Sequence, residues 1–513
     1  MVFVRRRAVV SVVVAALAAA APIALGGCGS DTDGLPAGEA PTALVTIEAG
    51  RAERRVPFGF LGLSLEYPAV EAYAGTDPLA PDPVFVELVR NLVPGQALVL
   101  RIGGDSADRT WWPTPGLARP PGVKFSITNR WLSVTRALAG ALRARLILGL
   151  NLEANSPRLA ASEATALLEG IGSHWVSAFE LGNEPDLYGT FPWYRTSSGR
   201  HVTGRSRGYD LSALIGDFMR FASALPHRSL AGPSLGTPSW IRQLGRFLDA
   251  VPRLGLVTLH RYPLQVCYTP RRSPRFPTVA RLLSSSSSIG LGDSFAPYVA
   301  AARARGLSLR VDELNSVSCG ADRAVSHTFA SALWVLNTLF EMLRAGVHGV
   351  NIHTFPGAGY ELFKLRRSGG LWQADVSPEY YGLLLFARAA PAGSRLLAVA
   401  VAGSAGGTVR TWATRAGDGT VRVVFVNTGS VARRLSVGLP GMTFGTGSLE
   451  RLSAAGVRAS GGVTLAGQSF GASTSTGRLA GAALTSSVPA VSGRYVVQVP
   501  AASAAMLVLS PPS

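Results

Sequence analysis

Lysine is almost missing from this chain of 513 residues: it occurs only at Lys124 and Lys364, and all other basic residues, out of 49, are arginine. With the high content of Ala, Gly and Pro, this bias is typical of a GC-rich genome. The net charge of +18 is therefore weak evidence for an anionic partner, although a basic surface would attract an acidic polysaccharide or wall polymer. Charged residues make up only 16% of the chain against 47% hydrophobic ones, which excludes a disordered protein.

Long apolar runs are also missing, except at the N-terminus. Three arginines at 5–7 precede an apolar stretch from Ala8 to Leu25, and Gly26-Gly27-Cys28 follows. This order is typical of a targeting segment, and its end resembles a bacterial lipobox, in which the cysteine is lipidated. The alternatives are an ordinary secretory signal or an uncleaved anchor, since the run is close to the minimum length of a membrane-spanning helix.

We therefore expect a signal peptide at 1–27 and a polar tether at 28–42. The mature protein would be held through Cys28 on the outer face of the cytoplasmic membrane, with secretion as the alternative. Only Cys267 and Cys319 then remain, in a compartment where a disulfide can persist. Export also removes nucleic acid as a partner, and no nucleic-acid recognition motif is present.

From residue 57 short apolar runs alternate with longer amphipathic ones, which predicts strands and helices in turn. Eight strands, each followed by a helical segment, predict an α/β fold, a (β/α)8 TIM barrel at 58–390. A doubly wound sheet is the alternative, but the Gly-rich turn after its first strand is missing. The predicted strands are Phe58–Leu65, Ala97–Ile102, Leu146–Asn151, Val176–Gly182, Leu230–Pro233, Leu254–His260, Leu307–Glu313 and His348–His353.

After Pro391 the helical pattern stops, and short alternating runs joined by Gly, Ser and Thr begin. This pattern predicts a C-terminal antiparallel β-sandwich domain at 391–513. Residues 43–57 contain a further strand-like segment that we expect to join the sandwich. Two domains agree with the chain length, which exceeds that of one ordinary hydrophobic core.

Glu184 is the most informative single residue. It closes an apolar strand within Phe179-Glu-Leu-Gly-Asn-Glu-Pro185, at the end of a barrel where active sites lie. A carboxylic acid there suits proton transfer to a sugar oxygen, and Asn183 could bind the neighbouring hydroxyl. The alternative is a helix start, with Asn183 as N-cap and Pro185 in the first turn.

A second acid, Glu313, ends the seventh strand, nearly opposite Glu184 across the barrel mouth. Two facing carboxylates predict a retaining glycosidase, with Glu184 as acid/base and Glu313 as nucleophile. Asp312 is the rival nucleophile, but strand alternation should send the two side chains to opposite sides. Tyr262 could hydrogen-bond Glu313 and keep it ionised. Three tryptophans, at 111, 112 and 193, are either sugar-stacking surfaces or packing residues.

Several stretches together resemble glycoside hydrolase family 79, the β-glucuronidases and heparanases, and the resemblance runs from about residue 43 to the end. The Asn183-Glu-Pro185 element alone specifies only the wider superfamily of retaining barrel glycosidases. The stretches that carry the resemblance are Leu63–Tyr67 (LSLEY), Arg101–Asp105 (RIGGD), Phe179–Pro185 (FELGNEP), His260–Pro263 (HRYP), Val311–Glu313 (VDE) and Asn351–His353 (NIH).

This resemblance implies an enzyme that cleaves β-linked glucuronic acid or a related uronide, without a metal or any other cofactor. It also implies that Glu66, Asp105, Asn183, Tyr262 and Tyr360 contact the sugar. The Gly359-Tyr360 segment resembles the loop that meets the uronate carboxylate through a backbone N–H and a phenol. Cys267 and Cys319 follow neighbouring strands six and seven, so a disulfide between these loops would stiffen the pocket rim.

The expected partners are thus a carbohydrate substrate and, through the N-terminal anchor, a membrane. Two alternatives remain open for the function. One is a retaining β-glycosidase of the same barrel class that acts on neutral sugars such as glucosides or xylosides. The other is a lipoprotein that binds glycans without cleaving them, which would require one of the two acids to be missing or blocked.

Overall fold

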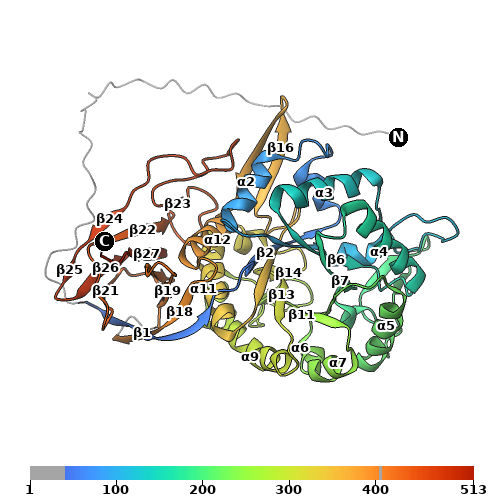
Figure 1. Ribbon diagram of the computed structural model, residues 1–513, viewed down its shortest axis with the longest axis horizontal. Helices are drawn as coiled ribbons and strands as arrows, with labels where there is room; N and C mark the ends of the chain where they lie inside the picture. The colour runs from blue at the N-terminus through green and yellow to red at the C-terminus, as the bar shows by residue number, and fades with distance from the viewer. Residues whose placement is uncertain (1–40, 404–406, 513) are drawn as a thin grey trace, which may run out of the picture. The chain divides into compact units, whose positions relative to one another are not determined.

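Eight parallel strands close into a barrel in the computed structural model, which describes residues 41–403 and 407–512 (Figure 1). Each strand is a short run that is buried along most of its length, as expected when helices cover a parallel sheet. The predicted (β/α)8 barrel is confirmed. In barrel order the strands are β10 (Leu230–Leu235), β11 (Leu254–Arg261), β13 (Leu309–Leu314), β15 (Gly349–His353), β2 (Leu61–Glu66), β3 (Val99–Gly103), β6 (Arg145–Leu150) and β7 (Val176–Leu181).

The helices that cover the barrel begin at clear sequence signals. Asp82 accepts hydrogen bonds from the N–H groups of Val84 and Phe85, and Ser156 caps the following helix through Leu159 N–H. Proline stands at the first position of both helices, where its missing N–H costs nothing. The main helices are α1 (Ala69–Ala74), α2 (Pro83–Leu92), α3 (Asn129–Leu142), α4 (Pro157–Ile171), α5 (Leu211–Ala224), α7 (Leu244–Ala250), α9 (Ile289–Arg303), α11 (Phe329–Ala345) and α12 (Pro378–Ala389).

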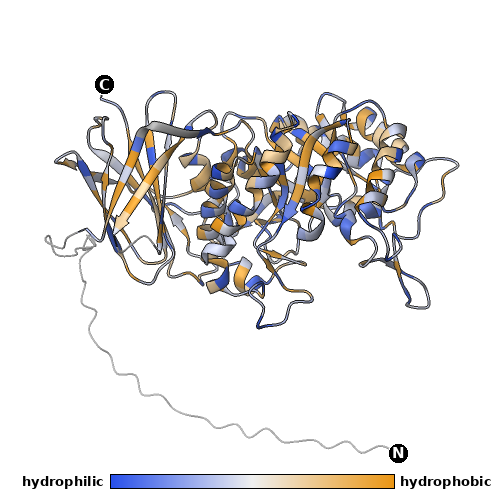
Figure 2. Ribbon diagram, turned by 90° about the horizontal axis from the view of Figure 1, so that it is seen from below, coloured by the Kyte–Doolittle hydropathy of each residue, from blue (hydrophilic) through white to orange (hydrophobic). Residues whose placement is uncertain are grey.

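The C-terminal part is one continuous antiparallel sheet of 11 strands, apart from one parallel pairing, that folds around its own apolar core. In Figure 2 its strands carry long hydrophobic stretches. The predicted sandwich is thus confirmed. The strand β1 pairs with both β18 and β21. The strands are β1 (Ala43–Arg55), β18 (Arg395–Gly403), β19 (Val409–Arg415), β20 (Val421–Asn427), β21 (Arg433–Gly438), β22 (Gly447–Ser453), β23 (Thr464–Leu465), β24 (Ser486–Val488), β25 (Ala490–Val491), β26 (Arg494–Val499) and β27 (Ser503–Leu509).

Helices α11 and α12 are buried on nearly every side because they lie between the barrel and this sheet (Figure 1). Phe340 of α11 stacks on Trp412 of β19, with ring centroids 5.4 Å apart. These contacts belong to the same apolar cluster as the interior of the barrel. The sheet therefore supports the barrel from the side and contributes no residue to the cavity described below.

The loops at the carboxyl ends of the barrel strands carry small elements of their own. They are η1 (Gly104–Arg109), the pair β4 (Thr110–Trp111) and β5 (Phe125–Ser126), η2 (Pro185–Leu187), the hairpin β8 (Pro192–Arg195) and β9 (His201–Thr203), α6 (Pro238–Ile241), the pair β12 (Leu264–Gln265) and β14 (Val317–Ser318), α8 (Val279–Leu282), η3 (Ser285–Ser287), α10 (Arg323–Ser326) and the hairpin β16 (Phe363–Ser368) and β17 (Leu371–Val376).

The predicted signal peptide, the lipidated Cys28 and the tether up to residue 40 lie outside the described residues. Among the residues described, none of the helices combines the length and apolar character needed to cross a bilayer.

Candidate active site

An open cavity of about 480 Å³ lies at the carboxyl ends of the barrel strands. It brings together residues that are up to about 300 positions apart in the chain, as the barrel fold requires. All but one of the predicted catalytic and sugar-contacting residues line it. Those residues are Glu66, Asp105, Asn183, Glu184, Tyr262, Glu313 and Tyr360, and His260 and His353 line it as well.

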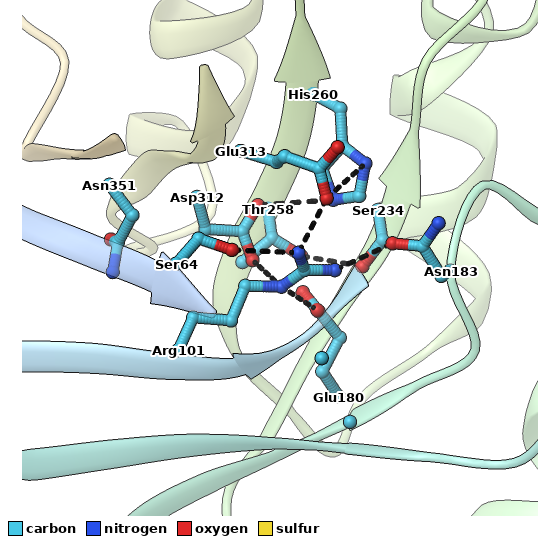
Figure 3. A network of polar contacts seen from close by, with 12 residues as sticks. Ser64, Arg101, Glu180, Asn183, Ser234, Thr258, His260, Asp312, Glu313 and Asn351 are labelled. Carbon is cyan, nitrogen blue, oxygen red and sulfur yellow. Dashed lines mark hydrogen bonds and ion pairs between the residues drawn. The ribbon is translucent and has the colours of Figure 1, made fainter. Parts of the chain in front are cut away.

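Arg101, on β3, is the centre of the polar network beneath this cavity (Figure 3). Its side chain is fully buried, and each of its three guanidinium nitrogens donates to a different partner. Nε donates to Glu180 at 2.6 Å, Nη1 to Glu313 at 2.7 Å, and Nη2 to the side-chain oxygen of Asn183 at 2.8 Å. Nη1 also contacts Ser64 Oγ at 3.1 Å. One cation thus positions four residues from three other strands: Ser64 of β2, Glu313 of β13, and Glu180 and Asn183 on and just after β7.

Glu313 is held in its ionised form. Its Oε2 accepts from Arg101, and its Oε1 accepts from the Tyr262 hydroxyl at 2.8 Å. Burial alone would raise the pKa of Glu313. The positive fields of His353, His260 and Arg101, with the Tyr262 hydrogen bond, outweigh burial and hold that pKa well below its usual value. A buried carboxylate that stays charged and faces a cavity is a suitable nucleophile.

Glu184 stands in an unusual backbone conformation at the end of β7. Its φ of +46° lies in the left-handed region, which costs energy for a residue with a Cβ. Its N–H donates to the Ser234 carbonyl at 3.1 Å. The helix start considered as an alternative is present, but as the single turn η2, with Pro185 first and Glu184, not Asn183, at the N-cap position. This turn aims the Glu184 side chain at the cavity, where 21% of it is exposed.

The two glutamates face each other across His260. One carboxylate oxygen of Glu184, one of Glu313 and a ring nitrogen of His260 all lie within 4.8 Å of one another. His260 Nδ1 is 3.3 Å from Glu184 Oε1 and 3.9 Å from Glu313 Oε2. Retaining glycosidases need their carboxyl groups about 5–5.5 Å apart, whereas inverting ones need about 6.5–9.5 Å. The spacing therefore fits the retaining mechanism.

Asp312, the rival nucleophile, does not line the cavity, but its position differs from the expected one. Strand alternation should turn it away from Glu313, yet its Oδ2 lies 3.5 Å from Arg101 Nε and its Oδ1 lies 3.6 Å from His260 Nε2. The ladder between β11 and β13 shifts register at this point, since Leu259 pairs with Val311 and His260 pairs with Glu313. The irregularity lets both acids turn toward the barrel axis, with Asp312 below Glu313.

Glu180 and Asp312 form a buried acid pair whose members carry different charges. Neither residue is exposed, and Asp312 receives no hydrogen bond from a neutral donor. Burial and the Glu180 carboxylate raise the pKa of Asp312 well above its usual value. Burial opposes ionisation of Glu180 too, but Arg101 and a hydrogen bond from Asp312 lower its pKa to about 2. The two pKa shifts have opposite signs, so they favour the neutral form of Asp312 beside the ionised form of Glu180.

Asp108 fixes the loop that carries Asn183. Its Oδ1 accepts from the N–H groups of Leu152 and Glu153, and its Oδ2 accepts from Asn183 N–H and from the Tyr188 hydroxyl. The carboxylate thereby ties the ends of β6 and β7 together. The side chain of Asn151, another polar strand end, is fully buried and bonds only the Thr110 carbonyl and Ala154 N–H, so its role is structural.

Glu66 and Asp105 form the opposite wall of the cavity. The Glu66 carboxylate accepts from the N–H groups of Asp105 and Ser106, and His353 Nε2 lies 3.5 Å from it. The Asp105 side chain is 73% exposed and contacts Asn183 Nδ2 at 3.3 Å and Arg109 at 3.8 Å. Both acids are thus open to a ligand.

Tyr360 lines the cavity beside Tyr262, with ring centroids 6.1 Å apart. Gly359 does not line it. The Gly359 N–H donates to the Gly320 carbonyl at 3.0 Å, so it is already paired and is not offered to a ligand. The Gly359 N–H is therefore not available to a ligand in this arrangement, whereas Tyr360 lines the cavity, and the contact of this loop with a uronate stays a prediction.

The three tryptophans considered as sugar platforms are packing residues. Trp111 and Trp193 are 8% and 7% exposed, and their ring N–H groups donate to Ser126 Oγ and the Asp108 carbonyl. Trp112 packs against the barrel core outside the cavity. The aromatic residues that do reach the cavity mouth, Phe191 and Tyr268, have no periodic sequence pattern that marks them.

Cys267 and Cys319 are joined by a disulfide in the structure. It links the loop after β11 to the loop after β13, next to the short parallel pair β12 and β14. Both cysteines line the cavity. The bridge therefore lies on the cavity rim.

Two groups of side chains among the described residues have the spacing to hold a metal ion: Glu180, His260 and Asp312, and Glu184, His260 and Glu313. Arg101 already brings positive charge to Glu180, Asp312 and Glu313. A metal ion in either group would meet repulsion from this guanidinium, which already pairs with three of the carboxylates.

Comparison with known proteins agrees with this geometry. Residues 411–506 match the glycosyl hydrolase family 79 C-terminal beta domain. A 4-O-α-L-rhamnosyl-β-D-glucuronidase from Fusarium oxysporum is structurally similar, with a TM-score of 0.68 and 20% identity over 90% of this chain and 99% of that one. The GH51 arabinofuranosidase from Xanthomonas axonopodis pv. citri has a TM-score of 0.65 and 15% identity over 92% of this chain and 100% of its own.

No curated protein sequence matches the chain. At identities this low the structural neighbours establish the fold, and the C-terminal domain supplies the link to a family. Its match and the barrel motifs point to the same family independently. Together they confirm the resemblance to glycoside hydrolase family 79 and identify the protein as a glycoside hydrolase.

Proposed function

We propose that the protein is a retaining glycosidase that cleaves β-linked glucuronic acid or a related uronide. Glu313 attacks the anomeric carbon, and Glu184 gives its proton to the departing oxygen as the glycosidic bond breaks. Glu184 then takes a proton from water, which attacks the same carbon and releases Glu313. The single observation that carries the proposal is the separation of the two carboxylates, within 4.8 Å, with Glu313 held ionised.

The acidic character of the sugar rests on separate observations. Arg261 and Arg275 line the cavity, and no carboxylate of the described residues lies within 4.0 Å of either guanidinium. Burial and the neighbouring Arg275 lower the pKa of Arg261. A bound carboxylate would relieve this repulsion. The similar Fusarium enzyme is described as a glucuronidase in complex with Rha-GlcA, which agrees with a uronide substrate.

The test is a panel of aryl β-glycosides that includes glucuronide, glucoside and xyloside. Wild type should cleave the glucuronide fastest, with the β-configuration of the first product retained in the NMR spectrum. Glu313→Gln should lower kcat/KM at least about a thousandfold, and Glu184→Gln should lower kcat by a similar factor because the second step loses its base. Asp249→Asn, which removes an exposed acid paired with Arg305, is the matched control and should behave as wild type.

Each other outcome has a defined meaning. Faster cleavage of the glucoside or the xyloside would show that the substrate is a neutral sugar and not a uronide. Binding without turnover across the panel would show that the protein binds glycans and is not an enzyme. Wild-type rates in either glutamine variant would remove that glutamate from the mechanism.

We also propose that the protein is exported and held at the outer face of the cytoplasmic membrane through lipidated Cys28, as its N-terminal sequence suggests. Cys28→Ala should move the protein from the membrane fraction to the soluble fraction and abolish labelling with a fatty-acid analogue. Unchanged membrane association would favour an uncleaved anchor, and release of the wild type into the medium would favour a secretory signal.

A further inference from the structure

Two exposed aromatic side chains stand at the mouth of the cavity. Phe191 is 40% exposed and Tyr268 is 83% exposed, although large apolar side chains are usually covered. Among the described residues, other large hydrophobic side chains with this exposure lie elsewhere on the surface, for example Phe58 at 72%. Phe191 and Tyr268 alone in that group line the cavity.

The two rings form a fixed pair. Their centroids are 5.7 Å apart and their planes are perpendicular, an arrangement in which aromatic rings attract one another. Phe191 follows the turn η2, and its N–H donates to the Leu187 carbonyl at 2.8 Å. Tyr268 directly follows Cys267, whose disulfide with Cys319 ties this loop to the next one. These contacts tie the backbone of both residues to the rim, and there the two rings lie against each other.

The lining of the cavity divides into two chemically different parts. One part consists of strand-end polar groups, which suit a sugar whose hydroxyls must all be bound. The other part is largely apolar and comes from loops: Leu187, Phe191, Pro192, Pro238 and Tyr268. Phe191 and Leu187 belong to the same loop as Glu184. The apolar part therefore lies on the side of the residue that must touch the leaving-group oxygen.

We propose that Phe191 and Tyr268 form a platform that binds a sugar ring on the leaving-group side of the scissile bond. The natural substrate is then a glycan of at least two sugars, not a glucuronide of a small alcohol. This inference rests on the proposed roles of Glu184 and Glu313. A pyranose offers one face of C–H groups, which packs on aromatic faces by dispersion and by burying apolar area. Its hydroxyl edge stays in water, which suits a site at the open rim.

The experiment compares two substrates with the same donor sugar. In one, the leaving group is fluoride, which cannot touch the platform; in the other, it is a second sugar. The variants are Phe191→Ala, Tyr268→Ala, and Tyr268→Phe, which keeps the ring. Phe58→Ala is the matched control, since it removes an exposed aromatic ring outside the cavity.

Each alanine variant should lower the ratio of kcat/KM for the disaccharide to kcat/KM for the fluoride by about tenfold. Tyr268→Phe should keep most of the ratio, and Phe58→Ala all of it. A ratio that is unchanged in both alanine variants, or the same fall in Phe58→Ala, would overturn the platform. If wild type cleaves another glycosyl fluoride but no glucuronyl fluoride, the proposed uronide fails, and the same ratio measured with that donor still tests the platform.

Discussion

Arg101 and Glu313 form a buried ion pair, with Nη1 donating to Oε2 at 2.7 Å and the arginine side chain fully inaccessible to solvent. The same guanidinium neutralises Glu180, so one cation serves two charged acids in the interior. Such a pair stabilises little by itself, because both charges lose their hydration. Breaking it is costly, because the remaining charge is left alone.

Arg101→Lys should therefore lose both activity and stability. Lysine carries the charge but lacks the planar fork that reaches Glu180, Glu313 and Asn183 together. We expect kcat/KM to fall about a hundredfold or more, and the free energy of unfolding to fall by about 3 kcal/mol. Urea denaturation and steady-state kinetics measure the two effects.

The matched control is Arg130→Lys, at an ion pair with Glu71 in which the arginine side chain is 60% exposed. It should change the free energy of unfolding by less than about 1 kcal/mol, because exposed pairs contribute little. Equal stability of the Arg101 and Arg130 variants would contradict the importance of the buried network.

Asp312→Asn and Glu180→Gln remove one oxygen each from the same buried acid pair, but we expect opposite results. The raised pKa of Asp312 favours its neutral form, which asparagine imitates with an amide that can donate to Glu180, so activity should stay within about tenfold of wild type. Glu180 is charged, and its replacement leaves Arg101 without its closest partner, at 2.6 Å. We expect Glu180→Gln to be the less stable variant by about 3 kcal/mol.

The comparison is made by thermal unfolding and kcat/KM on the aryl glucuronide. Loss of activity in Asp312→Asn as deep as in Glu313→Gln would revive Asp312 as the nucleophile. A destabilised Asp312→Asn beside a stable Glu180→Gln would show that the proton sits on the other acid.

The sequence predicts the barrel well because each strand is a local signal: a short apolar run between helical segments. Glu184 and Glu313 follow from their place at strand ends. Glu180 also carries a signal in the sequence, since a charged residue inside an apolar strand needs a buried counterion. Asp312 was misplaced because the register shift between β11 and β13 depends on how two strands pair, which neither strand encodes alone.

The C-terminal sheet was predicted only in outline. The alternating pattern predicts strands but not their order in the sheet, which places β1, at the start of the domain, between β18 and β21. Such pairing joins segments several hundred residues apart, so no local pattern reveals it. Phe191 and Tyr268 were missed for a different reason: loop residues carry no periodicity, and their exposure is known only once the fold is known.

The protonation of Glu153 should make the free energy of unfolding fall as pH rises. Its side chain is nearly buried at the cavity wall, and burial with the nearby Asp108 carboxylate raises the pKa of Glu153 to about 9. In the unfolded chain a glutamate titrates near about 4.3. The folded state therefore holds an extra proton between these values. The stability linked to Glu153 is present below about pH 4 and is lost as pH rises toward about 9.

Glu153→Gln removes this titration, so its melting temperature should fall less than that of wild type between pH 5 and about pH 9. Glu169→Gln, at an exposed position on α4, is the control and should follow the wild-type curve. Identical slopes for wild type and Glu153→Gln would contradict a protonated Glu153. Differential scanning fluorimetry across the pH range supplies the measurement.

The disulfide between Cys267 and Cys319 closes a segment of 52 residues. By loop-closure entropy a crosslink of this size stabilises by about 4 kcal/mol at most. Cys319→Ser should therefore lower the melting temperature under oxidising conditions, and a reductant should lower the wild type to a similar value. Two free thiols in the exported, unreduced protein would show that the bridge does not form.

The variant Glu184→Ala distinguishes the catalytic roles of the two carboxylates most clearly. An aryl glycoside with a good leaving group needs little acid catalysis, so Glu313 should still be glycosylated quickly. The second step then lacks its base, and glycosyl-enzyme should accumulate as a burst of phenol followed by a slow steady state. Azide needs no base and fits the space left by the removed side chain, so it should restore turnover and yield the β-glycosyl azide.

In Glu313→Ala the same anion would attack from the opposite face and give the α-glycosyl azide. The anomeric configuration of the product, read from the coupling constant of its anomeric proton, thus assigns each role. An α-azide from Glu184→Ala would exchange the roles of Glu184 and Glu313. His260 Nδ1 lies 3.3 Å from Glu184 Oε1, so the histidine is the rival group for carrying the proton. If Glu184 carries the proton, azide should not restore turnover in His260→Ala. Restored turnover in that variant would assign the proton to His260.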